Sequence, residues 1–389
     1  MFRWENVMDT SKFNQIVRDI YQTNNFIPLH EPRFLGNEKK YVLDTIDSTF
    51  VSSVGAYVNE FESKIQHFTG CAKAIATVNG TAALHIALLL AGVKRDDIVI
   101  TQALTFVATC NALSYIGAEP LFIDVSLKTM GLCPKALDNY LQENAFLDDQ
   151  GVCTHKATNK RISAIVPMHT FGHPVEIDEL QEVVTKWNIA LVEDAAESLG
   201  SYYKGKHTGI FGLVSALSFN GNKVITTGGG GMVLCQDEEL GVRAKHITTT
   251  AKIPHPYEFY HDENGFNYRL PNLNAALGCA QMESLEDFLS KKRNLAHQYQ
   301  NFFKDTDISF FVEPENCQSN YWLNAIICKD KTQRDLILDE TNSNKVMTRP
   351  IWTLMTRLPM YENALQGDLT NSLWLEERVV NIPSSVPLE

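Results

Sequence analysis

The sequence predicts an α/β fold built on a mostly parallel β-sheet with helices on both faces. From about residue 56 onward, short apolar runs alternate with longer segments of helical periodicity, which is typical of right-handed strand–helix–strand crossovers. The 389 residues are 44% hydrophobic and 21% charged, an ordinary composition for a globular chain of two or three domains. Ligands of such sheets collect at the carboxyl ends of the strands, so functional residues are expected there.

The predicted elements of this sheet follow one another along the chain. The pattern predicts a helix over 57–69, a strand over 73–78, a helix from 81, a strand over 98–101, a helix over 108–115, and strands over 120–124 and 162–167. A later apolar strand ends in the carboxylate of Asp194. The polar segment 144–160 is predicted to be an excursion between core elements.

The pattern changes after Pro271. A long amphipathic helix over 274–303 is followed by shorter strands within 321–328, a helix over 333–340 and the segment 346–352, a pattern consistent with a smaller α+β domain. We therefore predict an N-terminal arm over 1–35, a large α/β domain over 36–275 and a small α+β domain over 276–389.

Composition argues against several classes of partner. The formal charge of −12 disfavours nucleic acid and anionic membrane surfaces, which need a basic face. The longest apolar stretch, 82–91, is too short to cross a bilayer, and the charged N-terminus lacks the apolar core of a secretory signal, so a cytoplasmic location is expected. The eight cysteines show no C-x-x-C spacing, which predicts reduced thiols and no metal site.

Lys223 and Asp194 together suggest a site for pyridoxal phosphate. Lys223 lies in a segment that ends in a run of glycines, and Asp194 closes an apolar strand. The cofactor needs an amine that holds it as a Schiff base and an acid that keeps its ring nitrogen protonated, because only the pyridinium is a strong electron sink. Either residue alone is weak evidence, since most such lysines are solvated surface groups.

The segment 77–83 closes a strand and opens a helix, so the backbone N–H groups near Gly80 and Thr81 form a candidate anion site for the cofactor phosphate. The alternative is a plain tight turn with Thr81 as the helix cap. The glycine run 228–231 leads into a strand and not a helix, so it does not match a dinucleotide fingerprint, and a turn that lets backbone approach the cofactor suits it better.

Two further side chains are candidates with equally plausible alternatives. Phe106 follows the strand at 98–101, and its face could lie against the cofactor ring or pack in the core. Ser218 lies five residues before Lys223, where its hydroxyl could reach the phosphate or bond to backbone.

Through nearly all its length the chain resembles the DegT/DnrJ/EryC1/StrS sugar aminotransferases, which have the aspartate-aminotransferase-like fold of pyridoxal phosphate enzymes (fold type I). Six motifs between residues 79 and 278 carry this likeness. They are Asn79–Leu84, Thr105–Ala108, Val192–Glu197, Ser218–Lys223, Thr227–Gly231 and Tyr268–Gly278.

The resemblance implies roles for eight residues around the cofactor. Lys223 would form the Schiff base, Asp194 would pair with the ring nitrogen, Glu197 would lie near the ring hydroxyl and Phe106 would stack on the ring. Gly80, Thr81 and Ser218 would hold the phosphate, and Asn267 would reach the phosphate in the neighbouring subunit of a homodimer with shared active sites.

Within the family, the segments 50–55, 248–256 and 352–355 resemble the branch that serves legionaminic acid, bacillosamine and related surface glycans. That likeness implies amino transfer from L-glutamate to C4 of a nucleotide-linked 4-keto-6-deoxy sugar, with UDP-2-acetamido-2,6-dideoxy-hexos-4-ulose as the expected substrate. A dTDP- or GDP-linked keto sugar is the alternative, and a non-catalytic pyridoxal phosphate-binding module is a weaker one. Two positions depart from the family pattern: Glu197 stands where many members carry Gln, and Thr356 stands where His is expected.

Overall fold

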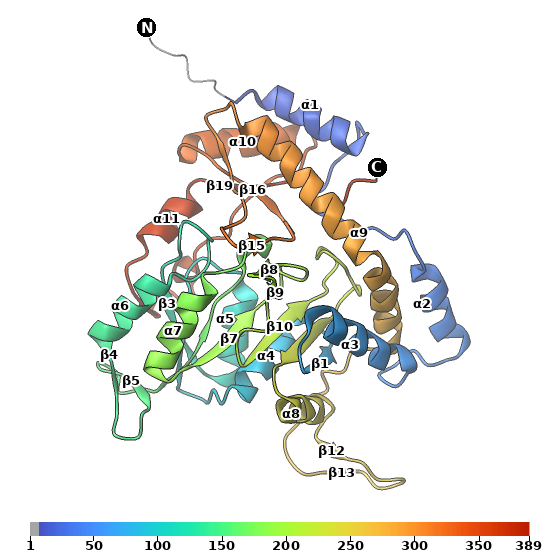
Figure 1. Cartoon of the computed structure of the whole chain (residues 1–389), viewed down its shortest axis with the longest axis vertical. Coiled ribbons are helices and arrows are strands. Elements are labelled where there is room, and N and C mark those ends of the chain that lie inside the picture. Colours follow the sequence, from blue (N-terminus) through green and yellow to red (C-terminus); the bar gives the residue numbers. More distant parts are fainter. Residues whose placement is uncertain (1–7, 389) are drawn as a thin grey trace.

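The computed structural model describes residues 8–388 and has an eight-stranded sheet at its centre (Figure 1). Neighbouring strands are parallel except at β11, which is antiparallel to both of its neighbours. The mostly parallel sheet predicted from the sequence is therefore confirmed. In spatial order the strands are β1 (Lys73–Thr77), β11 (Gly231–Cys235), β10 (Val214–Ser218), β7 (Ala190–Asp194), β6 (Ile162–Val166), β2 (Ile98–Gln102), β3 (Glu119–Ile123) and β18 (Leu365–Gln366).

Helices cover both faces of this sheet, as expected. One face packs against α4, which is apolar on nearly all sides because it lies between the sheet and neighbouring helices. The helices on that face are α4 (Gly80–Leu90), α5 (Val107–Ile116) and α8 (Glu238–Thr248). Those on the other face are α3 (Ala56–Thr69), α6 (Pro134–Asn144), α7 (Ile177–Trp187) and the first half of α9 (Asn272–Phe303).

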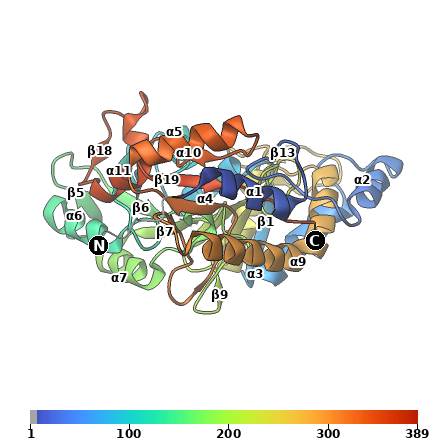
Figure 2. The ribbon, with the colours of Figure 1, turned by 90° about the horizontal axis from the view of Figure 1, so that it is seen from above.

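A second, antiparallel sheet of four strands lies beyond the carboxyl ends of the large sheet (Figure 2). Its strands, in spatial order, are β14 (Ser309–Phe310), β16 (Asn324–Ile327), β19 (Val379–Ile382) and β17 (Arg349–Pro350). The second half of α9 and α10 (Lys331–Ser343) pack on it, so α9 runs from one sheet to the other. The expected long helix and the small α+β part are both present.

The domain boundaries stay a prediction. Two segments, one near each end of the chain, pack against a part of the molecule other than the one to which they were assigned. The helix α1 (Thr10–Tyr21), within the predicted arm, buries Phe13 and Val17 in the same cluster as α9 and the small sheet. In the other direction, β18 pairs with β3 at the edge of the large sheet, and α11 (Thr370–Glu376) follows it. Residues 1–7, which suggested the absence of a secretory signal, lie outside the described residues.

Several short elements lie at the periphery. The predicted excursion 144–160 forms the hairpin β4 (Ala145–Leu147) and β5 (Cys153–His155). The hairpin of β12 (Lys252–Ile253) and β13 (Tyr260–His261) projects from the body (Figure 1). Also short are α2 (Glu38–Asp47), β8 (Tyr202–Tyr203), β9 (Lys206–His207), β15 (Cys317–Gln318) and two 3-10 turns at Thr170–Gly172 and Met355–Arg357.

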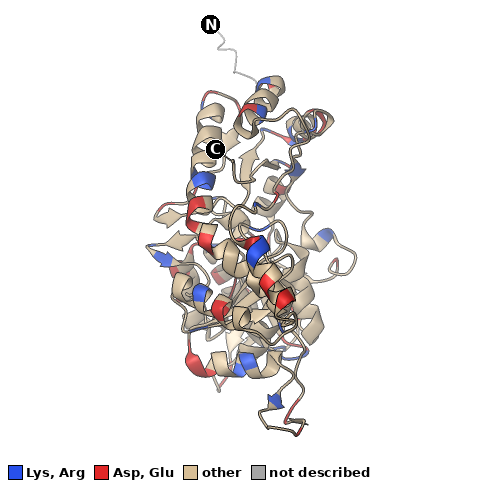
Figure 3. Ribbon diagram, turned by 90° about the vertical axis from the view of Figure 1, so that its right-hand side faces the viewer, with Lys and Arg blue, Asp and Glu red and all other residues tan. Residues whose placement is uncertain are grey.

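Acidic and basic residues are interspersed on the side of the molecule that Figure 3 shows. Across residues 8–388, none of the helices combines the length and apolar character that crossing a membrane requires. The eight cysteines are all free, six of them buried, as the scattered spacing predicted.

Candidate active site

A cavity of about 620 Å³ lies where the carboxyl ends of the large sheet meet the small sheet. Its wall combines strand ends and helix starts of the large part with residues of the small part, such as Trp322 and Trp352. Seven of the eight residues that the sequence predicted for the site line it: Gly80, Thr81, Phe106, Asp194, Glu197, Ser218 and Lys223.

One end of the cavity is the start of α4. Its N-cap is Asn79, whose side chain accepts a hydrogen bond of 2.8 Å from the amide of Ala82, so the alternative with Thr81 as the cap is wrong. Gly80 and Thr81 occupy the first turn, where backbone N–H groups have no partner within the helix. These donors and the positive end of the helix dipole favour an anion, and binding of the cofactor phosphate here stays a prediction.

The backbone packs closely around this anion site. A Cβ at Gly80 would lie 2.9 Å from the Cβ of Ser218, which ends β10, and one at Gly231 would lie 2.4 Å from the carbonyl oxygen of Asn79. Only glycine fits at either position, and the result is a cradle with the Ser218 hydroxyl at its edge.

Asp194 lies at the end of β7 and is almost fully buried. Burial raises the pKa of its carboxyl, and hydrogen bonds and the charge of Lys223 partly oppose that effect. One oxygen, Oδ2, accepts a 2.7 Å bond from the Thr109 hydroxyl, and Oδ1 accepts a 3.2 Å bond from the amide of Ala196. The carboxylate is therefore held in one orientation.

Lys223 lies close to a second acid that lines the same cavity, Glu197. Its Nζ is 3.5 Å from Oε1 of Glu197, and the other carboxylate oxygen of Glu197 accepts a 2.8 Å bond from the amide of Phe171. Burial raises the pKa of Glu197 to about 7, although the positive charge of Lys223 works against this rise. The Nζ also lies 3.8 Å from the centroid of the Trp322 ring.

The aromatic candidate is half exposed. Phe106 stands at the N-cap of α5 with 48% of its surface accessible, and its ring centroid is 6.3 Å from that of Trp352. The core-packing alternative for Phe106 is therefore wrong, and its face is free to meet a ligand in the cavity.

Asn267, the eighth predicted residue, does not line the cavity. It is exposed near the base of the β12–β13 hairpin, where its side-chain oxygen accepts a 2.9 Å bond from Nε of Arg269 and its backbone bridges to Thr249. Its predicted contact with a neighbouring subunit stays a prediction.

Sequence reasoning missed two residues that shape the site. Thr109 lies three residues after Phe106, within a segment that drew attention for Phe106 alone. Trp322 comes from the small part, about a hundred residues after Lys223, and no local spacing connects the two.

The chemistry of this donor set fits pyridoxal phosphate. A glycine cradle at a helix start suits the phosphate, a buried carboxylate suits a protonated ring nitrogen, and Lys223 is an amine inside the same cavity. Fold and site together define a pyridoxal phosphate-dependent enzyme with the aspartate-aminotransferase-like fold.

Comparison with known proteins identifies the family. The chain belongs to the DegT/DnrJ/EryC1/StrS aminotransferase family, whose model matches residues 34–389. Two GDP-perosamine synthases are similar in sequence. The one from Escherichia coli O157:H7 is 35% identical over 92% of this chain and 93% of its own, and that from Vibrio cholerae is 31% identical over 92% and 94%. The chain is thus an aminotransferase that acts on nucleotide sugars.

Solved structures agree on the fold. Helicobacter pylori PseC, an aminotransferase involved in the biosynthesis of pseudoaminic acid, superposes with a TM-score of 0.83 at 24% identity, covering 94% of this chain and 95% of its own. At that identity the likeness supports the architecture alone. The branch that the sequence suggested, legionaminic acid or bacillosamine, is not singled out by these relatives.

Proposed function

We propose that this protein transfers the amino group of L-glutamate to C4 of a nucleotide-linked 4-keto-6-deoxy sugar for surface glycan synthesis. The observation that carries the proposal is the placement of Lys223, Glu197 and Asp194 around one cavity that also holds the glycine cradle. An amine, a raised-pKa acid and a buried carboxylate are the groups that such a transfer needs.

Three residues of the chain have separate roles in the amino transfer. The cofactor, when bound, supplies an electron sink. The amine of Lys223 removes the proton from Cα of the amino donor and later delivers a proton to C4 of the sugar. Glu197, which lies 3.5 Å from that amine and has a pKa raised to about 7, can exchange protons with it near neutral pH. Asp194, buried and held by the Thr109 hydroxyl and the Ala196 amide, would pair with the protonated ring nitrogen.

Two candidate sugars have separate support. Similarity to GDP-perosamine synthases over nine-tenths of the chain favours a GDP-linked keto sugar. The segments 50–55, 248–256 and 352–355 favour UDP-2-acetamido-2,6-dideoxy-hexos-4-ulose. Arg349, which lines the cavity, is a cation available to the diphosphate of either, whereas Lys252 lies on the projecting hairpin, with its Nζ 4.1 Å from the centroid of the Phe259 ring.

The test is a panel of GDP-, UDP- and dTDP-linked 4-keto-6-deoxy sugars offered to the enzyme after it has been loaded with the amino group from L-glutamate. We expect release of 2-oxoglutarate in the loading step and one nucleotide class to accept the amine, with C4 of the product assigned by NMR. Lys223→Ala should lose turnover entirely. A variant that keeps the full rate, or loading without 2-oxoglutarate, contradicts the proposal.

We also propose a homodimer in which each subunit completes the site of the other. The exposed apolar side chains Leu43, Ile46 and Phe50, on and after α2, form a surface that a second subunit could cover, and the projecting hairpin carries the highly exposed Tyr257 and Phe259.

We propose a cytoplasmic location as well, since free thiols suit a reducing compartment.

A complementation experiment tests the shared site. Lys223→Ala and Asn267→Ala, each of low activity alone, are mixed under conditions that exchange subunits. If Asn267 acts across the interface, one site of each mixed dimer carries both defects and the other carries neither, so activity returns. An unchanged activity after verified exchange rules out the shared site.

A further inference from the structure

The amino transfer proposed above gives no role to Lys292, a fully buried lysine in α9. Lys292 has no exposed surface, and among residues 8–388 no carboxylate lies within ion-pairing distance of its amine. Burying an amine without an opposite charge is costly, and an apolar side chain of similar volume would fit a buried site more cheaply. Its presence therefore calls for a role.

The amine of Lys292 joins three separate segments. Its Nζ donates to the carbonyl oxygens of Ser384 at 2.6 Å and Trp322 at 3.2 Å, and it lies 3.2 Å from Nε2 of His30. These segments meet at the junction between the large and small parts, and the neighbours Leu29 and Leu323 line the cavity. The other nitrogen of His30, Nδ1, has no partner among the described residues.

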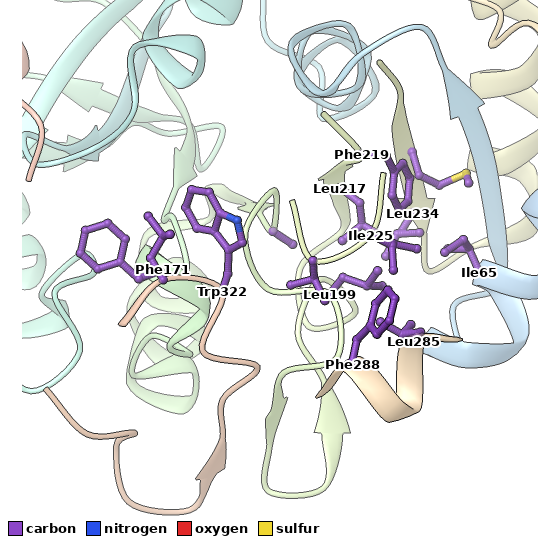
Figure 4. Packing of buried hydrophobic residues seen from close by; sticks show 14 of the residues in the cluster. Ile65, Phe171, Leu199, Leu217, Phe219, Ile225, Leu234, Leu285, Phe288 and Trp322 are labelled. Atoms are coloured by element: carbon purple, nitrogen blue, oxygen red, sulfur yellow. The ribbon is translucent and has the colours of Figure 1, made fainter. Parts of the chain in front are cut away.

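Trp322 is the segment that reaches the reacting amine. Its carbonyl is held by Lys292, and its indole Nε1 donates a 2.6 Å bond to the carbonyl of Asn222, the residue before Lys223. Between these two anchors its ring lies with the centroid 3.8 Å from Nζ of Lys223. Figure 4 shows Trp322 beside Phe171, at the end of the buried cluster opposite Ile65.

We propose that Lys292 is a positioning residue for Lys223, and that it acts by holding Trp322 against the reacting amine. The inference rests on the proposed function, since it assigns Lys223 as that amine. A cation is attracted to an aromatic face, so the indole ring fixes where the amine of Lys223 lies. Releasing Trp322 should therefore displace that amine and slow its reaction.

The first test needs no cofactor. The protein contains five tryptophans, so labelling with 5-fluorotryptophan gives five ¹⁹F NMR signals, and the one from Trp322 is assigned with Trp322→Phe. Lys292→Met should move the Trp322 signal. Lys291→Met is the matched control, because Lys291 is the adjacent residue of α9 and pairs with Asp287 at 3.1 Å on the surface. A Trp322 signal that stays in place in Lys292→Met overturns the proposal.

The second test measures the amine itself. The rate at which cofactor-free protein captures pyridoxal phosphate, followed by absorbance at one fixed pH, reports how well the amine of Lys223 is placed to attack the aldehyde. Lys292→Met and Trp322→Leu should each slow this capture by a similar factor, and the double variant should slow it no further. Lys291→Met should leave it unchanged.

The opposite outcomes are equally clear. A capture rate in Lys292→Met that equals the wild-type rate overturns the proposal, as does a double variant in which the two losses of rate multiply. If Lys292→Met does not fold, Lys292→Gln replaces it in both tests with the same expected directions. Failure of the wild type to capture pyridoxal phosphate would instead refute the proposed function.

Discussion

Replacing Thr109 by valine tests whether the orientation and charge of Asp194 matter for catalysis. The substitution keeps the shape of the side chain and removes the hydroxyl that donates a 2.7 Å bond to Oδ2 of Asp194. A hydrogen bond to a buried charged group contributes about 1.5–3 kcal/mol. The pKa of Asp194, already raised by burial, should therefore rise further when this bond is lost.

A less stable carboxylate holds the pyridinium less well, so both cofactor binding and turnover should suffer. The same free energy corresponds to a decrease of roughly 10- to 150-fold in kcat/KM. We expect a parallel weakening of pyridoxal phosphate binding, measured by equilibrium titration of cofactor-free protein. The hydroxyl of Thr105, 3.1 Å from that of Thr109, also loses a neighbour, so a small loss of stability accompanies the change.

Thr101→Val is the matched control. Thr101 is also fully buried, near the end of β2, two strands from β7, and its hydroxyl donates a 2.7 Å bond to the carbonyl of Val166 and not to Asp194. Thr101→Val should lose about 1 kcal/mol of stability and Thr109→Val about 1.5–3 kcal/mol, but only Thr109→Val should lose activity and cofactor affinity. Equal kinetics in the two variants would refute the assignment of Asp194 to the ring nitrogen.

Three other substitutions have defined outcomes. Gly80→Ala places a methyl group 2.9 Å from Ser218 and should weaken pyridoxal phosphate binding at least about tenfold, whereas Gly36→Ala, which meets only ordinary contacts, should bind normally in the same titration. Glu197→Gln removes a carboxyl whose pKa is raised from 4.5 to about 7 in the fold. The folded wild-type protein holds this proton more tightly than the unfolded chain does, so its free energy of unfolding should fall by roughly 1–3 kcal/mol relative to the variant as pH rises from about 4.5 to 7. Urea unfolding of cofactor-free protein at pH 5 and 8 measures this, and an equal difference at both pH values contradicts it. Asn320→Ala breaks buried bonds to the backbone of residues 197, 199 and 322, so a loss of roughly 2–4 kcal/mol is expected in urea unfolding, and an unchanged midpoint argues against it.

Local sequence was sufficient to predict most of the fold and one wall of the site. The strand that ends at Asp194, the turn that opens α4 at Gly80, and the segment from Ser218 to Lys223 each carry their signal within a few residues. Strand ends of a parallel sheet meet at one edge, so these segments had to converge. That rule requires no knowledge of side-chain contacts, which explains why six of the predicted residues line one cavity, whereas the seventh, Glu197, was predicted only through the family resemblance.

The domain boundaries show where local pattern is insufficient. The two strand residues of β18 and the helix α1 have ordinary local signals, but β18 pairs with the large sheet and α1 packs with the small one. Their partners are more than two hundred residues away in the sequence, and neither pairing has a spacing rule that would reveal it.

By itself, then, the sequence determined the class of fold, the family and the residues that meet at the strand ends, because periodicity and motif spacing act over short stretches of chain. Only the tertiary structure decided that Thr109 orients Asp194, that Trp322 covers Lys223, and that the buried Lys292 holds Trp322 in place. Those contacts join segments up to about a hundred residues apart, and they depend on the exact packing of one part of the molecule against the other.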